Sequence, residues 1–330
     1  MQMKRIILAA ALVFAMILLP ACGGAGGEGE GAEADGGKIT VVTTIFPEYD
    51  WVRQIAGDRM EELEVTYLLG QGVDIHSYQP SVQDVTKIVD ADVLIYVGGE
   101  SDAWIEDLLK ESGREEQIVL RLMDPVSAAL VEEELIEGME PEEEEEAEEE
   151  EGPEYDEHIW LSLRNAKTCC TAIRDALSEA DPEGTDVYAA NAETYIGQLD
   201  ALDQEYSAAV ADAPQRTMVF AGRFPYRYLT EDYGLEYYAA FPGCSAESEA
   251  SFETITFLAG KVQELGLKYI VQTDNETDIA TAILSAAADP ALQTVEMNSM
   301  QSVSAADAEQ MTYLGIMQTN LEAVRTALGS

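Results

Sequence analysis

The sequence predicts an α/β protein of two lobes, each a mainly parallel sheet flanked by helices, joined by one long rigid helix. Short apolar runs alternate with helical patterns from residue 39 onward, which is typical of βαβ units. The same alternation begins again after residue 214. The chain beyond its N-terminal segment is roughly 290 residues long, which is more than a single hydrophobic core usually serves.

The first lobe is expected to span residues 38–181. Its apolar runs predict strands at 39–45, 65–69, 91–97 and 118–122, and its helical patterns predict helices at 49–56, 81–89 and 104–109. This order implies a parallel sheet covered by helices. The adjacent Cys169 and Cys170 lie on a further expected helix, and we interpret them as small buried hydrophobic side chains rather than ligands. No disulfide framework is indicated.

A single long helix is expected over residues 182–213. Its apolar and aromatic residues recur at spacings of three and four, namely Tyr188, Ala192, Tyr195, Ile196, Leu199, Leu202 and Tyr206. Asp181 and Pro182 are typical of a helix start, and Pro214 of a stop. At about 1.5 Å per residue the helix is about 45 Å long, so we expect it to hold the two lobes in a nearly fixed relation.

The second lobe is expected to span residues 214–330. Strands are predicted at 217–221, 236–241, 268–272 and 294–297, with helices at 252–265, 277–287 and 311–328. The two series share the same character, so the lobes should resemble each other.

The N-terminus has the features of a secretory signal. Lys4 and Arg5 precede an apolar stretch, residues 6–19, that is too short to cross a membrane as a helix. Residues 1–21 are therefore expected to be a signal peptide, and the sequence around Cys22 resembles a lipoprotein box whose cysteine is acylated. The alternative is ordinary cleavage beside a chance cysteine. Residues 22–37 are Gly-rich and acidic, so they should form a flexible tether at the extracytoplasmic face of a bacterial membrane.

The chain is strongly acidic, with a formal net charge of −46. An expected loop at residues 132–157 carries seventeen acids and no Lys or Arg. This charge makes nucleic acid and anionic lipid headgroups poor partners, and cations good ones. Within the loop, residues 140–151 are almost pure glutamate, which is consistent either with a solubilising insertion or with a segment that gathers metal ions.

Each of the two histidines lies in a short polar and aromatic motif. His76 lies within residues 74–78, after an expected strand and a Gly-rich turn, and His158 lies within residues 156–160, directly after the acidic loop. Loops at the carboxyl ends of strands carry the ligands in open α/β sheets. Imidazole beside carboxylate is the ligand chemistry of a divalent metal site, although a lone histidine is more often structural.

Further motifs recur in order along the chain. They are Asp74–Ser81, Asp92–Gly98 with Trp104, Asp156–Ser162 with Asn165 and Ala166, Phe224–Tyr226, Tyr233–Leu235, and Tyr313 and Leu314 followed by Met317, Asn320 and Leu321. With this ordered set, residues 38 to 328 resemble the zinc/manganese class of solute-binding lipoproteins that feed metal to ABC importers. The resemblance implies a rigid interdomain helix and a variable loop, rich in His or acidic residues, before the second histidine.

The resemblance also implies a ligand set that this chain only half matches. His76 and His158 fall on the two ligands of the first lobe. The third ligand position, normally His or Glu, is Ala221, and the fourth is nearest to Asn298, which offers only an amide oxygen.

Three explanations for the missing ligands remain open. Carboxylates substitute, with Asp274, Glu247 and Glu249 as the candidates. Alternatively, the two histidines bind metal with water and loop acids, which gives weaker binding than a closed shell. Or the site has left metals for another solute, in which case Arg223 would favour an anionic ligand.

The acids beside the histidines have two interpretations of their own. Asp74, Asp156 and Glu157 either orient the imidazole rings or are merely loop acids.

The sequence therefore predicts a lipid-anchored, monomeric binding protein that captures a divalent transition metal and delivers it to the membrane permease of an ABC importer. Zinc is expected first and manganese is the alternative, since both accept these ligand types. A surface metal buffer or adhesin, and a diverged family member that binds a non-metal solute, are the other hypotheses. Enzyme activity is not expected, because the sequence offers no Ser-His-acid or Cys-His arrangement.

Overall fold

The computed structural model describes residues 37–330 apart from 115, 140–153, 245–248 and 275–276. The predicted lipid attachment residue Cys22, the candidate ligand Glu247 and the glutamate run at 140–151 lie outside the described residues. Residues 38–330 form one compact unit. Within the described part of the chain, no helix has both the length and the apolar character needed to cross a membrane.

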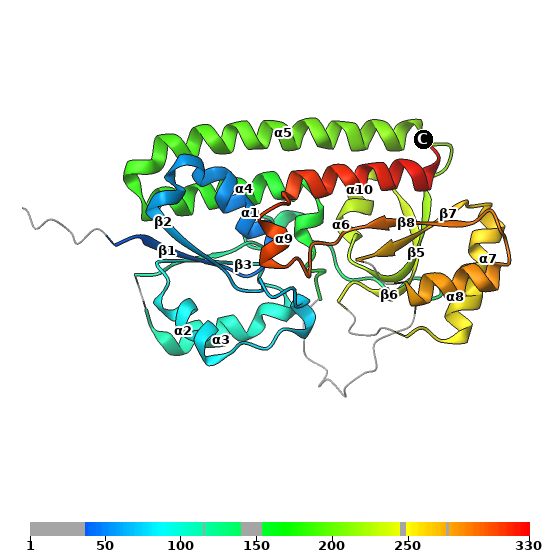
Figure 1. Ribbon diagram of the computed structural model, residues 1–330, viewed down its shortest axis with the longest axis horizontal. Helices are drawn as coiled ribbons and strands as arrows, with labels where there is room; N and C mark the ends of the chain where they lie inside the picture. The colour runs from blue at the N-terminus through cyan, green and yellow to red at the C-terminus, as the bar shows by residue number, and fades with distance from the viewer. Residues whose placement is uncertain (1–36, 115, 140–153, 245–248, 275–276) are drawn as a thin grey trace, which may run out of the picture. The chain divides into compact units, whose positions relative to one another are not determined.

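The first lobe contains a four-stranded parallel sheet in the order β2-β1-β3-β4. Its strands are β1 (Ile39–Thr43), β2 (Leu63–Tyr67), β3 (Val93–Tyr96) and β4 (Ile118–Arg121). Helices α1 (Phe46–Ala56) and α4 (Leu163–Ala180) cover one face, and α2 (Val82–Asp90) and α3 (Ala103–Ser112) cover the other (Figure 1). The parallel sheet predicted for this lobe is confirmed.

The second lobe repeats this arrangement, with a parallel sheet in the order β6-β5-β7-β8. Its strands are β5 (Thr217–Phe224), β6 (Glu236–Pro242), β7 (Tyr269–Thr273) and β8 (Gln293–Met297). Its helices are α6 (Arg227–Tyr233), α7 (Phe252–Leu265), α8 (Asp278–Ala287), the short α9 (Ala305–Ala308) and α10 (Tyr313–Leu328). The strands of each sheet end toward the other lobe (Figure 1).

The predicted long helix is also confirmed. One 3-10 turn, Pro182–Gly184, leads into α5 (Thr185–Asp212), which has 28 residues. Most of the aromatic and apolar residues that predicted it are buried, Tyr188 and Tyr206 completely. Helix α5 packs against α1 and α4 of the first lobe and against α10 of the second, so it lies along both lobes (Figure 1).

The larger hydrophobic core extends from one lobe to the other. It includes Trp51 of α1, Tyr206 of α5 and Tyr313 of α10, whereas a smaller core around Leu258 and Ile283 lies entirely in the second lobe. The rings of Trp51 and Tyr313 meet edge to face, with their centroids 5.0 Å apart. The two lobes therefore do not have one separate core each, because helices α5 and α10 contribute to the packing of both.

Hydrogen bonds fix the start of α10 against the first lobe. The Tyr313 amide donates to Asp50 Oδ2 over 2.8 Å, and the Tyr313 hydroxyl donates to the Trp160 carbonyl over 2.7 Å. Both interactions are buried, so they are strong relative to hydrogen bonds at the surface.

Candidate metal centre

The two histidines lie on similarly built turns. His76 lies in the 3-10 turn Ile75–Ser77, after β2, where its backbone amide donates to Asp74 Oδ1 over 3.0 Å. His158 begins the turn at Ile159–Leu161, and its amide donates to Asp156 Oδ1 over 2.8 Å. An Asp two residues before each His thus closes a local turn, which fixes the direction of the imidazole. Both imidazoles are almost inaccessible, with side-chain exposures of 4% and 0%.

The imidazoles face each other through their Nε2 atoms, which are 3.2 Å apart. Two nitrogen ligands of one tetrahedral zinc ion, each at 2.0–2.1 Å from the metal, lie about 3.3 Å from each other. The observed separation therefore suits two ligands of a single ion.

A third side chain completes this contact from the second lobe. Gln301 lies in the loop after β8 and is 2% exposed, and its Nε2 atom is 2.6 Å from His76 Nε2 and 2.9 Å from His158 Nε2. Rotation of the Gln301 side-chain amide by about 180° would place its carbonyl oxygen, in place of its nitrogen, beside the two Nε2 atoms. Gln301 was not among the ligands predicted from the sequence. The available signal was its position in a loop after a strand's carboxyl end, as for the histidines.

A carboxylate supports each imidazole from behind. Glu157 Oε1 is 3.1 Å from His76 Nδ1, and Asp156 Oδ1 is 3.0 Å from His158 Nδ1. Each carboxylate favours a proton on Nδ1, which leaves the lone pair of Nε2 directed at the shared space. Of the two interpretations of these acids, the geometry favours orientation of the rings.

The charges within this group shift the pKa values of its members. Burial alone would raise the pKa of Glu157, but a hydrogen bond from His76, the charges of both histidines and the Ser101 hydroxyl lower it to about 2. Burial alone would lower the pKa of His158, yet the charge and hydrogen bond of Asp156, with the charge of Glu157, raise it. These opposite shifts show that the carboxylates and imidazoles form one coupled electrostatic group.

Cys244 also reaches this group from the second lobe. It follows β6 by two residues, and one ligand atom each of His76, Glu157 and Cys244 lie within 4.8 Å of one another. The preceding residue must be glycine, since a Cβ atom on Gly243 would lie 2.9 Å from His158 Cε1 and 2.8 Å from the Phe224 carbonyl oxygen. The backbone before Cys244 thus lies directly against the imidazole of His158.

The other residues considered for the second lobe have different surroundings. Ala221 is 1% exposed and belongs to the smaller core. Asn298 accepts a hydrogen bond from the Met300 amide, and Asp274 accepts hydrogen bonds from the amide and hydroxyl of Ser299. Both therefore shape the loop that carries Gln301. Glu249 is exposed. Which of these residues ligate a metal stays a prediction.

Comparison with known proteins places the chain in a family. The family described as ZnuA, zinc-uptake complex component A, periplasmic, matches residues 41–327. The chain belongs to the ZnuA family. It is 31% identical over 296 residues to the zinc-binding lipoprotein AdcA of Streptococcus pneumoniae, a match that covers 89% of this chain and 56% of that protein. The chain thus spans little more than half the length of the first curated relatives.

One further relative and one solved structure support this placement. Over 315 residues the chain is 27% identical to the high-affinity zinc uptake system protein ZnuA of Bacillus subtilis, with 94% of each covered. The crystal structure of the Zn(II)-bound ZnuA-like domain of Streptococcus pneumoniae AdcA aligns with a TM-score of 0.70 and 28% identity, covering 89% of this chain and 100% of that one. The expected family and two-lobed fold are confirmed.

Arg223 of this ZnuA-family chain joins the second lobe to the first. It follows Gly222, at a bulge in β5, and its Nη2 atom is 2.8 Å from Asp74 Oδ2. Burial would raise the pKa of Asp74, but Arg223 and His76 outweigh burial and lower it. The positive charge of Arg223, which would favour an anionic solute, is therefore paired with the carboxylate of Asp74.

Asp102 is a buried acid next to this group. It is 2% exposed, and its Oδ2 atom accepts hydrogen bonds from the amides of Val97 and Gly98. Burial and the charge of Glu157 raise its pKa to about 7, despite those hydrogen bonds. Folding therefore favours the protonated form, so the stability that Asp102 contributes is complete below its ordinary pKa of 3.8 and is lost as the pH rises from there through 7.

We expect Asp102→Asn to raise the free energy of unfolding at pH 8, by about 1–3 kcal/mol, and to raise it by a smaller amount at pH 5. Asparagine keeps an acceptor for both amides without a charge. Urea denaturation at both pH values would measure the effect. Asp107→Asn is the matched control, because Asp107 lies on the exposed side of α3. A loss of stability at pH 8 would show that the structure needs the ionised acid.

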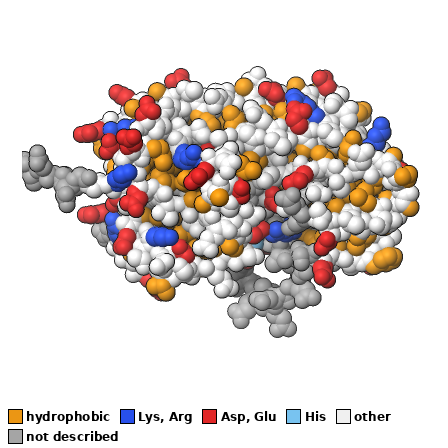
Figure 2. All heavy atoms as spheres, viewed as in Figure 1, with side chains coloured by type: hydrophobic (Ala, Val, Ile, Leu, Met, Phe, Trp, Pro, Cys, Tyr) orange, Lys and Arg blue, Asp and Glu red, His pale blue; other side chains and the backbone are white. Residues whose placement is uncertain are grey.

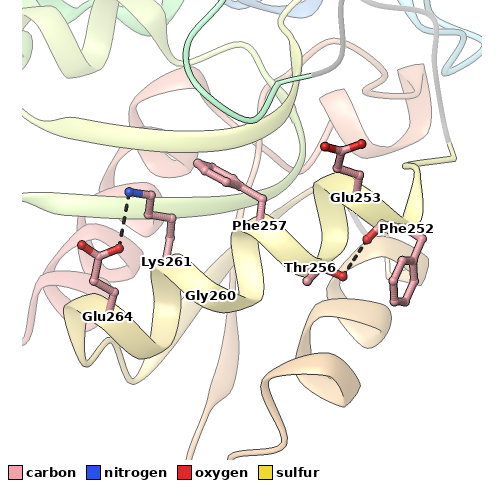
Figure 3. Close-up of a pocket in the computed structure, with 7 residues that line it drawn as sticks. All are labelled: Phe252, Glu253, Thr256, Phe257, Gly260, Lys261 and Glu264. Carbon is pink, nitrogen blue, oxygen red and sulfur yellow. Dashed lines mark hydrogen bonds and ion pairs between the residues drawn. The ribbon is translucent and has the colours of Figure 1, made fainter.

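A separate groove of about 700 Å³ runs along α7. Figure 3 shows its lining, with the ring of Phe252 turned away from the helix and Lys261 directed at Glu264, 3.4 Å away. The residues of this lining are Phe252, Glu253, Thr256, Phe257, Gly260, Lys261 and Glu264. They include no imidazole or thiol, so the groove lacks the donors that define the histidine site.

Proposed function

We propose that this chain is a lipid-anchored, extracytoplasmic solute-binding protein that captures Zn²⁺ between its lobes and delivers it to an ABC importer. The observation that carries the proposal is the pair of Nε2 atoms 3.2 Å apart, each on an imidazole backed by a carboxylate. Neutral imidazoles oriented in this way are zinc ligands. His76 and His158 would be the ligands from the first lobe, with Gln301 beside them from the second.

The relatives support zinc as the cargo. The AdcA protein is named a zinc-binding lipoprotein, and the Bacillus subtilis protein belongs to a zinc uptake system. The acidic surface supports cation capture as well, since acidic side chains are spread over both lobes on the face seen in Figure 2. Anchoring through Cys22 is supported by the lipoprotein-like sequence around that residue.

Isothermal titration of residues 38–330 with Zn²⁺, and separately with Mn²⁺, tests the proposal. The same body without residues 142–151 is the matched control. We expect one tight Zn²⁺ site that survives the deletion. Weak, multiple sites that disappear with the glutamate run would instead identify a metal buffer, and no tight binding of Zn²⁺ would overturn the proposal.

A further inference from the structure

The second lobe brings toward the histidines a side chain of higher zinc affinity than an amide. Gln301 presents a neutral amide to the histidines, whereas Cys244 presents a thiol. Cys244 lies just beyond the carboxyl end of β6, the edge of the sheet from which parallel α/β proteins present ligands. Its position is fixed by the close packing of Gly243 against the imidazole of His158.

The distances allow a shared metal ion. The Cys244 sulfur lies within 4.8 Å of a ring nitrogen of His76 and of a carboxylate oxygen of Glu157. In a tetrahedral zinc site, with Zn–S of about 2.3 Å and Zn–N of about 2.0 Å, sulfur and nitrogen are about 3.6 Å apart. Rotation of the Cys244 side chain about its Cα–Cβ bond can move the sulfur toward this distance from the two imidazoles.

We propose that Cys244 is the cargo ligand supplied by the second lobe, in place of the side chain that Ala221 lacks, and that its thiolate selects zinc over manganese. This inference rests on the proposed function, since it names a further donor at the same site. On binding, the thiol releases its proton to solvent and the sulfur donates an electron pair to the metal.

The chemistry of the donor gives the selectivity. Soft thiolate ligands favour zinc, whereas manganese prefers carboxylate, carbonyl and water oxygens. Two imidazoles with oxygen ligands alone would accept both metals. A thiolate added to the same pair would increase the affinity for zinc and leave that for manganese nearly unchanged.

Co²⁺ provides a direct readout, because a cobalt–thiolate bond gives an intense charge-transfer band in the near ultraviolet. The body from Lys38 to Ser330 would be titrated with Co²⁺, unmodified and as Cys244→Ser. Cys170→Ser is the matched control, since Cys170 is a completely buried thiol on α4. We expect the band in the unmodified protein and in Cys170→Ser, and its loss in Cys244→Ser. Zinc affinity of Cys244→Ser should fall at least about tenfold, while manganese affinity changes less than about threefold.

The outcomes separate this inference from the proposed function. Tight zinc binding without a thiolate band, or a band that persists in Cys244→Ser, would overturn the role of Cys244 and leave the metal receptor intact. Absence of zinc binding by the unmodified body would overturn the proposed function itself. If Cys244→Ser fails to fold, alkylation of the unmodified protein decides: zinc should protect Cys244 from iodoacetamide, and equal labelling with and without zinc would contradict the proposal.

Discussion

His158→Ala should lower the affinity for Zn²⁺ at least about 100-fold, the largest effect expected of any single substitution at the site. The imidazole is 0% exposed, its Nδ1 is held by Asp156, and its Nε2 faces both His76 and Gln301. Alanine removes the ligand and leaves the carboxylate of Asp156 buried without its partner. Competition titration against a zinc chelator would measure the loss.

Asp175→Ala is a suitable control for that measurement, because it removes an exposed acid of α4 outside the site. The control should bind zinc as the unmodified protein does. Circular dichroism should show that His158→Ala keeps the fold. An unchanged zinc affinity in a folded His158→Ala protein would contradict both the ligand assignment and the proposed function.

Trp51→Ala should lower the free energy of unfolding by about 3–5 kcal/mol, the range for removing a large aromatic side chain from a packed core. Trp51 is 0% exposed and packs edge-on against Tyr313, so its loss opens a cavity where α1 meets α10. Urea denaturation followed by far-ultraviolet circular dichroism would measure the change.

Trp51→Phe is the matched variant. Among the described residues no group accepts a hydrogen bond from the indole Nε1, so phenylalanine removes volume without breaking such a bond. We expect it to cost less than half as much as alanine. Equal losses for both variants would show that the indole has a role beyond packing.

Most strands and helices were predictable because their apolar runs and helical periods are local properties of the sequence. Strand β5 is longer than its sequence alone predicts. The strand was expected to stop at Ala221, before Gly222 and Arg223, but it continues to Phe224 through a bulge between Phe220 and Arg223. A bulge keeps a strand in its sheet despite an irregular pair of residues, and only the neighbouring strand reveals it.

The histidines of the candidate site were predictable, whereas its second-lobe members were not. His76 and His158 are the only two histidines in the chain, and each follows a recognisable local signal. Gln301 is 225 residues from His76, and its contact depends on how the two lobes pack. The resemblance to the family pointed to Ala221, but the side chain of Ala221 is a methyl group that packs in the smaller core of the second lobe.

Helix α10 has a consequence for the order in which the chain folds. It follows every other helix of the described residues in the chain, yet Tyr313 at its start packs against Trp51 and bonds to Asp50, both of which are made early. A chain emerging from the ribosome therefore holds a first lobe that lacks part of its core until Tyr313 has been made. The packing of the first lobe is thus completed by a segment that begins 263 residues after Asp50.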